Sequence, residues 1–362
     1  MLQFSFYFIF TLLISVFFFQ KIKDNRVGLV LLFLLFFLVA FRGENVGHDT
    51  IKYLNPAYIS NWAEEADFAT FKFDNLGAKV ELISGFIFRI ITVFGLNPRW
   101  VLIVYTIIMV MFLYLSCKRF KTKIPYVAFF FVLFGFYFYS MSAARQFAAI
   151  PVILYAMSFL QDVDLNKNKF LLWMIVAVFI HSFSIICLPL YFIDKVPSNK
   201  LIPWFVYILS LVLVLVKIDF INQLSILISV DKISDYMSSD STQAYSPTRV
   251  LGYWIEISVY IYFYYRKKKY DMKQLGVKKL TNVDKLYLLS VLLYAFFFHY
   301  DGLIGRARYN FCIIQCIFLA NYFEKMHLKN ATDVLAFMCL FILRLLKNDA
   351  FINALESDYY LA

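Results

Sequence analysis

Apolar blocks of 15–24 residues recur along the whole chain, with short polar stretches between them. Inside a bilayer no water is available for backbone groups, so blocks of this length fold as helices that satisfy their own amides. The chain is 62% hydrophobic and 16% charged, whereas a soluble domain is about 25% charged. We therefore predict an all-α, polytopic integral membrane protein with about 10–12 transmembrane or re-entrant helices, forming a single domain over residues 1–362.

Three polar stretches are rich in lysine and arginine: residues 21–26, 117–123 and 266–285. The positive-inside rule places such stretches on the cytoplasmic side. The loops at about 42–79 and 217–247 then lie on the outer face. Because the basic residues follow this topology, we interpret the net charge of +11 as an orientation signal and predict no nucleic-acid partner.

The segment 170–193 decides whether this topology is consistent. An even number of crossings must separate the basic stretches at 118 and 266, yet the sequence offers five apolar segments there. The segment breaks at His181–Ser182, and each half of about 11 residues is too short to cross a bilayer. We predict a bent or re-entrant pair with His181 at the bend. The short segment 80–94 is expected to dip in from the outer side.

Arginine and lysine are distributed differently over this topology. Eighteen of the 24 lysines are cytoplasmic, whereas eight of the 11 arginines lie in the membrane or toward the outer face. A charged residue at the bilayer centre costs roughly 2.5–3.5 kcal/mol or more and marks a functional site. A guanidinium binds phosphate or carboxylate through two parallel hydrogen bonds and keeps its charge. The distribution of arginine therefore predicts an anionic substrate.

The stretch FRGENVGHDTIKY, residues 41–53, directly follows the second apolar segment and holds the first candidate site residues. Its glycines allow sharp backbone turns. An arginine suits an anion, and a carboxylate or histidine suits proton transfer. The alternative is an ordinary polar loop. The candidates from this stretch are Arg42, His48, Asp49 and Tyr53.

Polar residues also interrupt the apolar segments themselves. Arg145 and Gln146 lie among small residues that allow helices to approach closely, and we predict that they face a cavity as anion ligands. Glu81 begins the segment 80–94, and His181 lies at the predicted bend; both are candidates for proton transfer or for orienting a sugar. The alternatives are a structural ion pair, a helix N-terminal acid and a histidine bound to backbone.

The stretch YDGLIGRARYN, residues 300–310, is expected to be a short outer-face turn. Arg306, Arg308 and Tyr309 would clamp a phosphate there, or the arginines would snorkel to the interface. Cys312 and Cys316 are one helical turn apart but have no matching Cys or His pair. We therefore predict no metal site.

The order and spacing of these residues resemble the EpsG family, which groups with the Wzy-type O-antigen and capsule polymerases. One position departs from the family pattern: Phe183 stands two residues after the histidine, where the family often has a small polar residue. The resemblance covers about residues 40–325 and rests on Arg42, Gly47, Asp49, Tyr53, Glu81, Arg145, Gln146, His181, Arg306 and Tyr309.

The resemblance implies a GT-C-like glycosyltransferase of the bacterial inner membrane with its active site toward the periplasm. Such an enzyme transfers a glycan from undecaprenyl pyrophosphate to a lipid-linked repeat unit and requires no cofactor or metal. The sequence has no P-loop or GxGxxG motif that would hold a nucleotide. The implied partners are the two lipid-linked oligosaccharides and the bilayer, with a chain-length regulator protein as a further candidate.

The resemblance also implies roles for the candidate residues. Arg145 would face the pyrophosphate of the lipid carrier, with Arg42, Arg306 and Arg308 as its partners. The base that activates the acceptor hydroxyl stays open. The candidates for it are Asp49, His48, Glu81 and His181.

Three other functions remain open. An O-antigen ligase would use the same arginine chemistry with a different acceptor. A flippase for lipid-linked oligosaccharides would be expected to show two similar halves, and the sequence shows no convincing internal repeat. A membrane acyltransferase would need a histidine or serine site that an acyl donor reaches from the cytoplasm, where the loops offer mainly lysines.

Overall fold

The computed structural model describes residues 25–44, 46–47, 49–65, 81–216, 246–277, 279–299, 302–326 and 330–360. Every element in these ranges is a helix, which confirms the all-α prediction. The candidate base His48 and most of the predicted outer-face loop 217–247 lie outside the described residues.

Mostly short helices make up the first half of the described chain. They are α2 (Asn25–Ala40), α3 (Thr50–Leu54), α4 (Pro56–Glu65), α5 (Leu82–Val93), α6 (Arg99–Phe120), α7 (Ile124–Leu133), α8 (Phe136–Ser142), α9 (Ala144–Met157) and the 3-10 turns η2 (Ser158–Leu160) and η3 (Asp162–Asp164).

The second half contains the longest helices. Its elements are α10 (Lys167–Ile180), the 3-10 helix η4 (Ser182–Lys195), α11 (Ile202–Leu215), α14 (Pro247–Leu275), α15 (Asn282–Phe296), the 3-10 turn η5 (Phe297–His299), α16 (Gly302–Met326) and α17 (Ala331–Tyr360).

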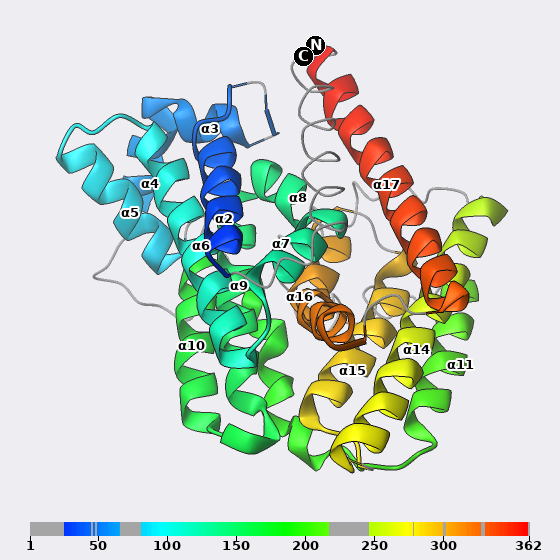
Figure 1. Cartoon of the computed structure of the whole chain (residues 1–362). Coiled ribbons are helices and arrows are strands. Elements are labelled where there is room, and N and C mark those ends of the chain that lie inside the picture. Colours follow the sequence, from blue (N-terminus) through cyan, green and yellow to red (C-terminus); the bar gives the residue numbers. More distant parts are fainter. Residues whose placement is uncertain are drawn as a thin grey trace.

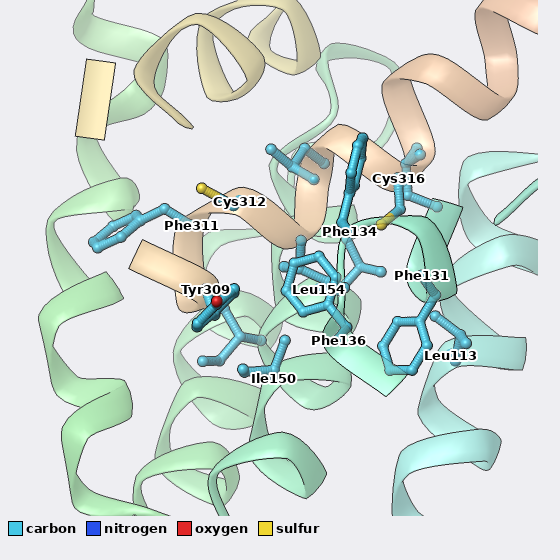
Figure 2. Close-up of a cluster of buried hydrophobic side chains, with 14 of the residues drawn as sticks. Leu113, Phe131, Phe134, Phe136, Ile150, Leu154, Tyr309, Phe311, Cys312 and Cys316 are labelled. Atoms are coloured by element: carbon cyan, nitrogen blue, oxygen red, sulfur yellow. The ribbon is translucent and has the colours of Figure 1, made fainter. Parts of the chain in front are cut away.

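Helices α7, α9 and α16 lie at the centre of the molecule, with α2–α6 on one side and α11, α14 and α17 on the other (Figure 1). Figure 2 shows the apolar packing of this centre, where Ile150 and Leu154 lie among Phe131, Phe136 and Tyr309, all of them buried. A polar group buried in such surroundings costs free energy unless it has a partner. The polar residues of α9 and α16 are therefore informative about function.

Only α6, among the described helices, is long and apolar enough by itself to cross a membrane. Its 22 residues give a length of about 33 Å. Helices α7 and α8 pass the same test together but are bent by 62°, as in a broken span or a re-entrant loop. Several other apolar segments form helices of 10–17 residues. The total of 10–12 spanning or re-entrant helices and the GT-C-like architecture stay predictions.

The predicted bend at His181 is confirmed. Helix α10 ends at Ile180, His181 adopts an extended backbone with φ −152° and ψ 113°, and η4 then packs back along α10. The far ends of the two arms meet, because Lys167 Nζ and Asp194 Oδ1 form an ion pair at 2.7 Å. The two halves of the segment therefore run back along each other, as a bent pair would, and the membrane topology stays a prediction.

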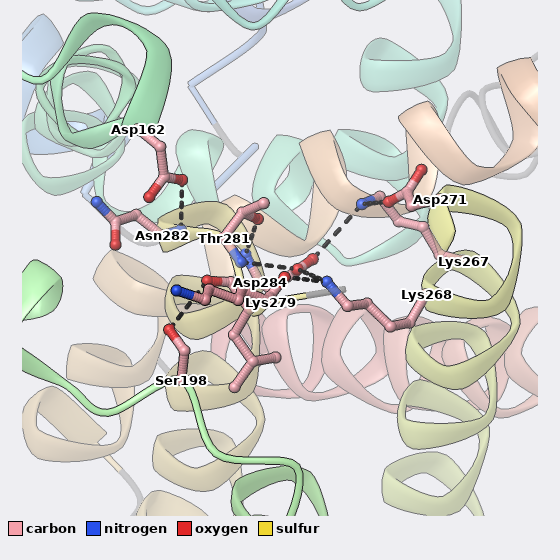
Figure 3. Close-up of polar contacts among 10 residues, drawn as sticks. Asp162, Ser198, Lys267, Lys268, Asp271, Lys279, Thr281, Asn282 and Asp284 are labelled. Atoms are coloured by element: carbon pink, nitrogen blue, oxygen red, sulfur yellow. Dashed lines mark hydrogen bonds and ion pairs between the residues drawn. The ribbon is translucent and has the colours of Figure 1, made fainter. Parts of the chain in front are cut away.

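The basic stretch 266–285 is ordered at its start, because α14 continues as a helix to Leu275. Figure 3 shows how it joins α15: Thr281 and Asp284 form a capping box, and Lys267 and Lys268 approach the Asp284 carboxylate at 3.5 and 3.3 Å. Burial acts to lower the pKa of Lys267, but the carboxylates of Asp284 and Asp271 outweigh it, so this pKa is raised. The lysine stays charged and anchors the loop.

The prediction of a tight turn over residues 300–310 is wrong from Gly302 onward. Helix α16 begins at Gly302, so Arg306, Arg308 and Tyr309 lie in its first turns rather than in a loop. Glycine is tolerated near a helix terminus, and the apolar run that follows continues the helix without interruption.

Candidate functional site

Helix α9 begins at a break just before the predicted anion ligands. The helical path stops at Ala143, with φ −130° and ψ 65°, so Arg145 and Gln146 fall in the first turn of α9. In an unbroken helix the carbonyl of Met141 would accept a hydrogen bond from the N–H of Arg145. Here the hydroxyl of Thr50 lies 3.2 Å from that carbonyl, while its nearer acceptor is the carbonyl of Val46 at 2.5 Å. The break therefore places a helix N-terminus, whose dipole attracts anions, beside Arg145.

The guanidinium of Arg145 is held from two directions. Its Nη1 donates to Glu81 Oε2 at 2.8 Å, and its Nε donates to the hydroxyl of Tyr53 at 3.2 Å. The ring of Trp62 lies 5.6 Å from its Cζ. Arg145 thus has the ion pair that the structural alternative requires, but its carboxylate partner also binds a histidine.

Glu81 connects Arg145 to His181. Its Oε1 pairs with His181 Nδ1 at 2.9 Å and accepts from the backbone N–H of Ser182 at 3.2 Å. An imidazole whose Nδ1 donates to a carboxylate carries its lone pair on Nε2. That Nε2 atom is buried, and it has no hydrogen-bond partner within the described part of the chain. This arrangement can accept a proton at Nε2. We call Tyr53, Glu81, Arg145 and His181 the Glu81 cluster.

Local structure brings Glu81 and His181 together. Glu81 is the extended residue that precedes α5, with φ −75° and ψ 157°. Ser84, in the first turn of α5, donates through its hydroxyl to the carbonyl of Ile180 at 3.0 Å. The start of α5 is therefore fastened to the end of α10, next to the bend.

The loop after α2 packs against the α8–α9 break. Arg42 is 5% exposed, and its Nε donates to Thr50 Oγ1 at 2.8 Å while its Nη1 donates to the carbonyl of Val39 at 2.7 Å. Its Nη2 is buried without a hydrogen-bond partner among the described residues. Arg42 thus braces the loop beside the Glu81 cluster.

Gly47 allows this close packing. Its φ is +89°, and a Cβ atom there would lie 2.0 Å from the carbonyl oxygen of Met141. We expect Gly47→Ala to cost about 1–3 kcal/mol of stability, because both the backbone and the contact must shift, and to reduce activity as the α8–α9 break moves. Thermal unfolding of the purified protein in detergent measures the first effect. Gly43→Ala is the matched control, since a Cβ at Gly43 meets nothing within 4 Å, and equal melting temperatures for the two variants would contradict this role.

Of the remaining candidates, Gln146 and Asp49 lie next to the Glu81 cluster, since Gln146 follows Arg145 and the carbonyl of Asp49 accepts from the N–H of Tyr53 at 3.2 Å, whereas Arg308 contacts other residues. Gln146 is 3% exposed and donates through Nε2 to the backbone carbonyl of Arg306 at 3.2 Å, which ties α9 to α16. Arg308 donates to the hydroxyl of Tyr309 at 3.3 Å and to that of Tyr253 at 3.0 Å. Asp49 precedes α3 and forms an ion pair with Lys52 at 3.7 Å. The arginines of the predicted clamp therefore lie at two different positions: Arg145 belongs to the Glu81 cluster, and Arg308 lies beside Tyr253.

The surroundings of Arg308 and Tyr253 contain a buried carboxylate that was not predicted from the sequence. Glu256 of α14 is 0% exposed and accepts from the hydroxyls of Tyr260 at 2.9 Å and Tyr294 at 2.7 Å. Two cations of α17, Arg344 and Lys347, form ion pairs with it. We call these five residues the Glu256 cluster. A carboxylate inside the apolar segment 248–265 was the signal that could have found it.

Comparisons with known proteins identify a family. The sequence model of the EpsG family matches residues 25–359, nearly the whole chain. No curated protein and no solved structure matches the chain. Among the described residues, no group of three or more His, Cys, Asp or Glu side chains is arranged to hold a metal ion.

Proposed function

This chain belongs to the EpsG family of polysaccharide-biosynthesis membrane proteins, and we propose that it is a polysaccharide polymerase that uses a lipid-pyrophosphate-linked donor. Undecaprenyl pyrophosphate of the bacterial inner membrane is the proposed carrier, and the periplasmic face is the proposed side of reaction. The observation that carries the proposal is the Glu81 cluster, in which a fixed guanidinium and a carboxylate-bound imidazole lie side by side.

The proposed reaction needs one base and one anion site. The acceptor hydroxyl attacks the anomeric carbon of the donor glycan, and its proton passes to His181 Nε2. The bond from that carbon to the pyrophosphate oxygen breaks, and the electron pair leaves with the lipid pyrophosphate. Glu81 orients the imidazole and stabilises the imidazolium that forms, through the hydrogen bond at 2.9 Å.

Arg145 acts on the leaving group in this proposal. Negative charge builds on the pyrophosphate as the glycosidic bond breaks, and donors fixed in advance stabilise that charge without reorganising. Glu81 and Tyr53 fix the guanidinium, and the N-terminus of α9 adds its dipole. Arg42, with its buried Nη2, lies close by to assist.

The polymerase is tested by gel analysis of surface polysaccharide from a strain that lacks the gene, with and without its restoration. We expect the ladder to collapse to the core plus one repeat unit, because single units are still made, flipped and ligated. Loss of all surface glycan would instead support the ligase or the flippase. An intact ladder would exclude polymerisation and direct attention to acyl transfer.

A further inference from the structure

The Glu256 cluster has more positive than negative charge. Arg344 and Lys347 both pair with Glu256, and Lys347 also donates to the hydroxyl of Tyr294 at 2.7 Å. Arg308 lies against the same aromatic rings, with its Cζ 5.8 Å from the centre of Tyr294. Two cations therefore share one carboxylate, and Arg308 adds a third positive charge against the same rings.

Arg308 is the cation with the weakest partners. Its Nη1 and Nη2 donate to the hydroxyls of Tyr253 and Tyr309, and its Nε is buried with no hydrogen-bond partner among the described residues. Arg308 is partly buried, and withdrawing a guanidinium from water costs free energy unless a charge or a full set of hydrogen bonds compensates it. An anionic ligand would supply the negative charge that the tyrosine hydroxyls do not.

The surroundings of the cluster favour an amphiphile. The side chain of Lys347 is 29% exposed, so the cluster is open on one side. The neighbouring residues Ile342 and Leu346 of α17 are 49% and 63% exposed. Cations inside and apolar side chains outside match an anionic head group that carries a hydrocarbon tail.

We propose that Arg308, Arg344 and Lys347 form a second anion site, which binds the phosphate group of a lipid-linked substrate. This inference rests on the proposed function, in which donor and acceptor each carry a lipid pyrophosphate but only one of these is the leaving group. The Glu81 cluster receives the leaving group, and the Glu256 cluster holds the other lipid. The first turns of α16 reach both places, since Arg306 accepts from Gln146 and Arg308 donates to Tyr253.

Glu256 sets the affinity of this site by competing with the ligand. Glu256→Gln keeps an oxygen acceptor for Tyr260 but removes the negative charge that pairs with Arg344 and Lys347. An anion is therefore expected to bind several-fold more tightly to this variant. A cluster that serves stability alone predicts no such gain. Lys347→Gln, at the exposed edge, is expected to weaken binding on the order of tenfold.

The experiment measures thermal stabilisation of the purified full-length protein in detergent by three probes. They are a short-chain polyprenyl phosphate, inorganic phosphate and the uncharged polyprenol of the same chain length. We expect stabilisation by polyprenyl phosphate that weakens in Lys347→Gln and in Arg308→Gln and strengthens in Glu256→Gln. Equal stabilisation by inorganic phosphate would overturn the lipid assignment, and equal stabilisation by the polyprenol would overturn the anion site.

Arg145→Gln separates this site from the proposed active site. We expect this variant to keep the Lys347-dependent stabilisation while it loses glycan transfer. In a transfer assay, Lys347→Gln is expected to raise the KM for lipid-linked substrate with little change in kcat, because it touches no reacting atom. Absence of glycan transfer in the wild type and in all the variants would refute the proposed function. It would leave the measured binding of polyprenyl phosphate unaffected. Unchanged probe binding in both Lys347→Gln and Arg308→Gln would refute the second site.

Discussion

Arg145→Lys is expected to lose on the order of 10²-fold of the transfer rate, while the protein still inserts and folds normally. Lysine keeps the charge but not the planar fork, so it cannot hold Glu81 and Tyr53 as the guanidinium does, at 2.8 and 3.2 Å. The loss should appear in kcat, because the charge on the pyrophosphate grows only as the bond breaks. Chain elongation from a lipid-linked repeat unit is the measurement.

Arg119→Lys is the matched control for this change. Arg119 lies in the last turn of α6, pairs with Asp164, whose side chain is 64% exposed, and donates through Nε to Ser158 at 2.9 Å. An ion pair with one exposed partner contributes little to stability, and Arg119 is not a candidate site residue, so the same substitution there should leave activity near that of the wild type. Full activity in Arg145→Lys would show that bidentate binding by the guanidinium is not required.

His181→Asn is expected to lower kcat by roughly 10²–10⁴-fold, the usual contribution of a positioned general base. The asparagine amide can still donate to Glu81 Oε1 from about the place of Nδ1, so the bend and the ion pair with Arg145 should survive. What is removed is Nε2, the buried atom that can take the proton. Single-turnover kinetics with a lipid-linked donor measures the effect on chemistry.

His299→Asn provides the comparison for the histidine. The Nε2 of His299 bonds to the backbone carbonyl of Leu213 at 2.9 Å, so its role is structural in this account. We expect its variant to retain transfer with at most a modest loss of stability. If His181→Asn matched it in activity, the base would have to be sought among Asp49, His48 and Glu81 instead.

The sequence was sufficient to find the members of the Glu81 cluster one by one. A charge or a histidine inside an apolar segment is costly, and that cost singled out Glu81, Arg145 and His181 separately. The bend at His181 followed from counting crossings. The cluster itself was not predictable, because Glu81 and His181 are 100 positions apart and only tertiary packing brings them within 2.9 Å.

The turn that would hold the arginine clamp is the part of the prediction that is wrong. Two glycines and two arginines predict a tight turn over residues 300–310, yet the following apolar run extends α16 back to Gly302. The guanidinium of Arg308 then donates to the hydroxyl of Tyr253, and Gln146 donates to the backbone carbonyl of Arg306. Glu256 interrupts an apolar segment as Arg145 does. Its role was not predictable from the sequence, because its cationic partners come from α17, about 90 residues later.

Reconstitution of the purified protein into liposomes with a lipid-pyrophosphate-linked repeat unit is the direct test of whether this chain forms glycosidic bonds. We expect longer lipid-linked glycans, with one lipid pyrophosphate released for each new glycosidic bond. We also expect both products to be lost in Arg145→Lys and His181→Asn and kept in Arg119→Lys. Recovery of the repeat unit unchanged, or movement of it across the bilayer without new bonds, would contradict the assignment of this chain as a polymerase.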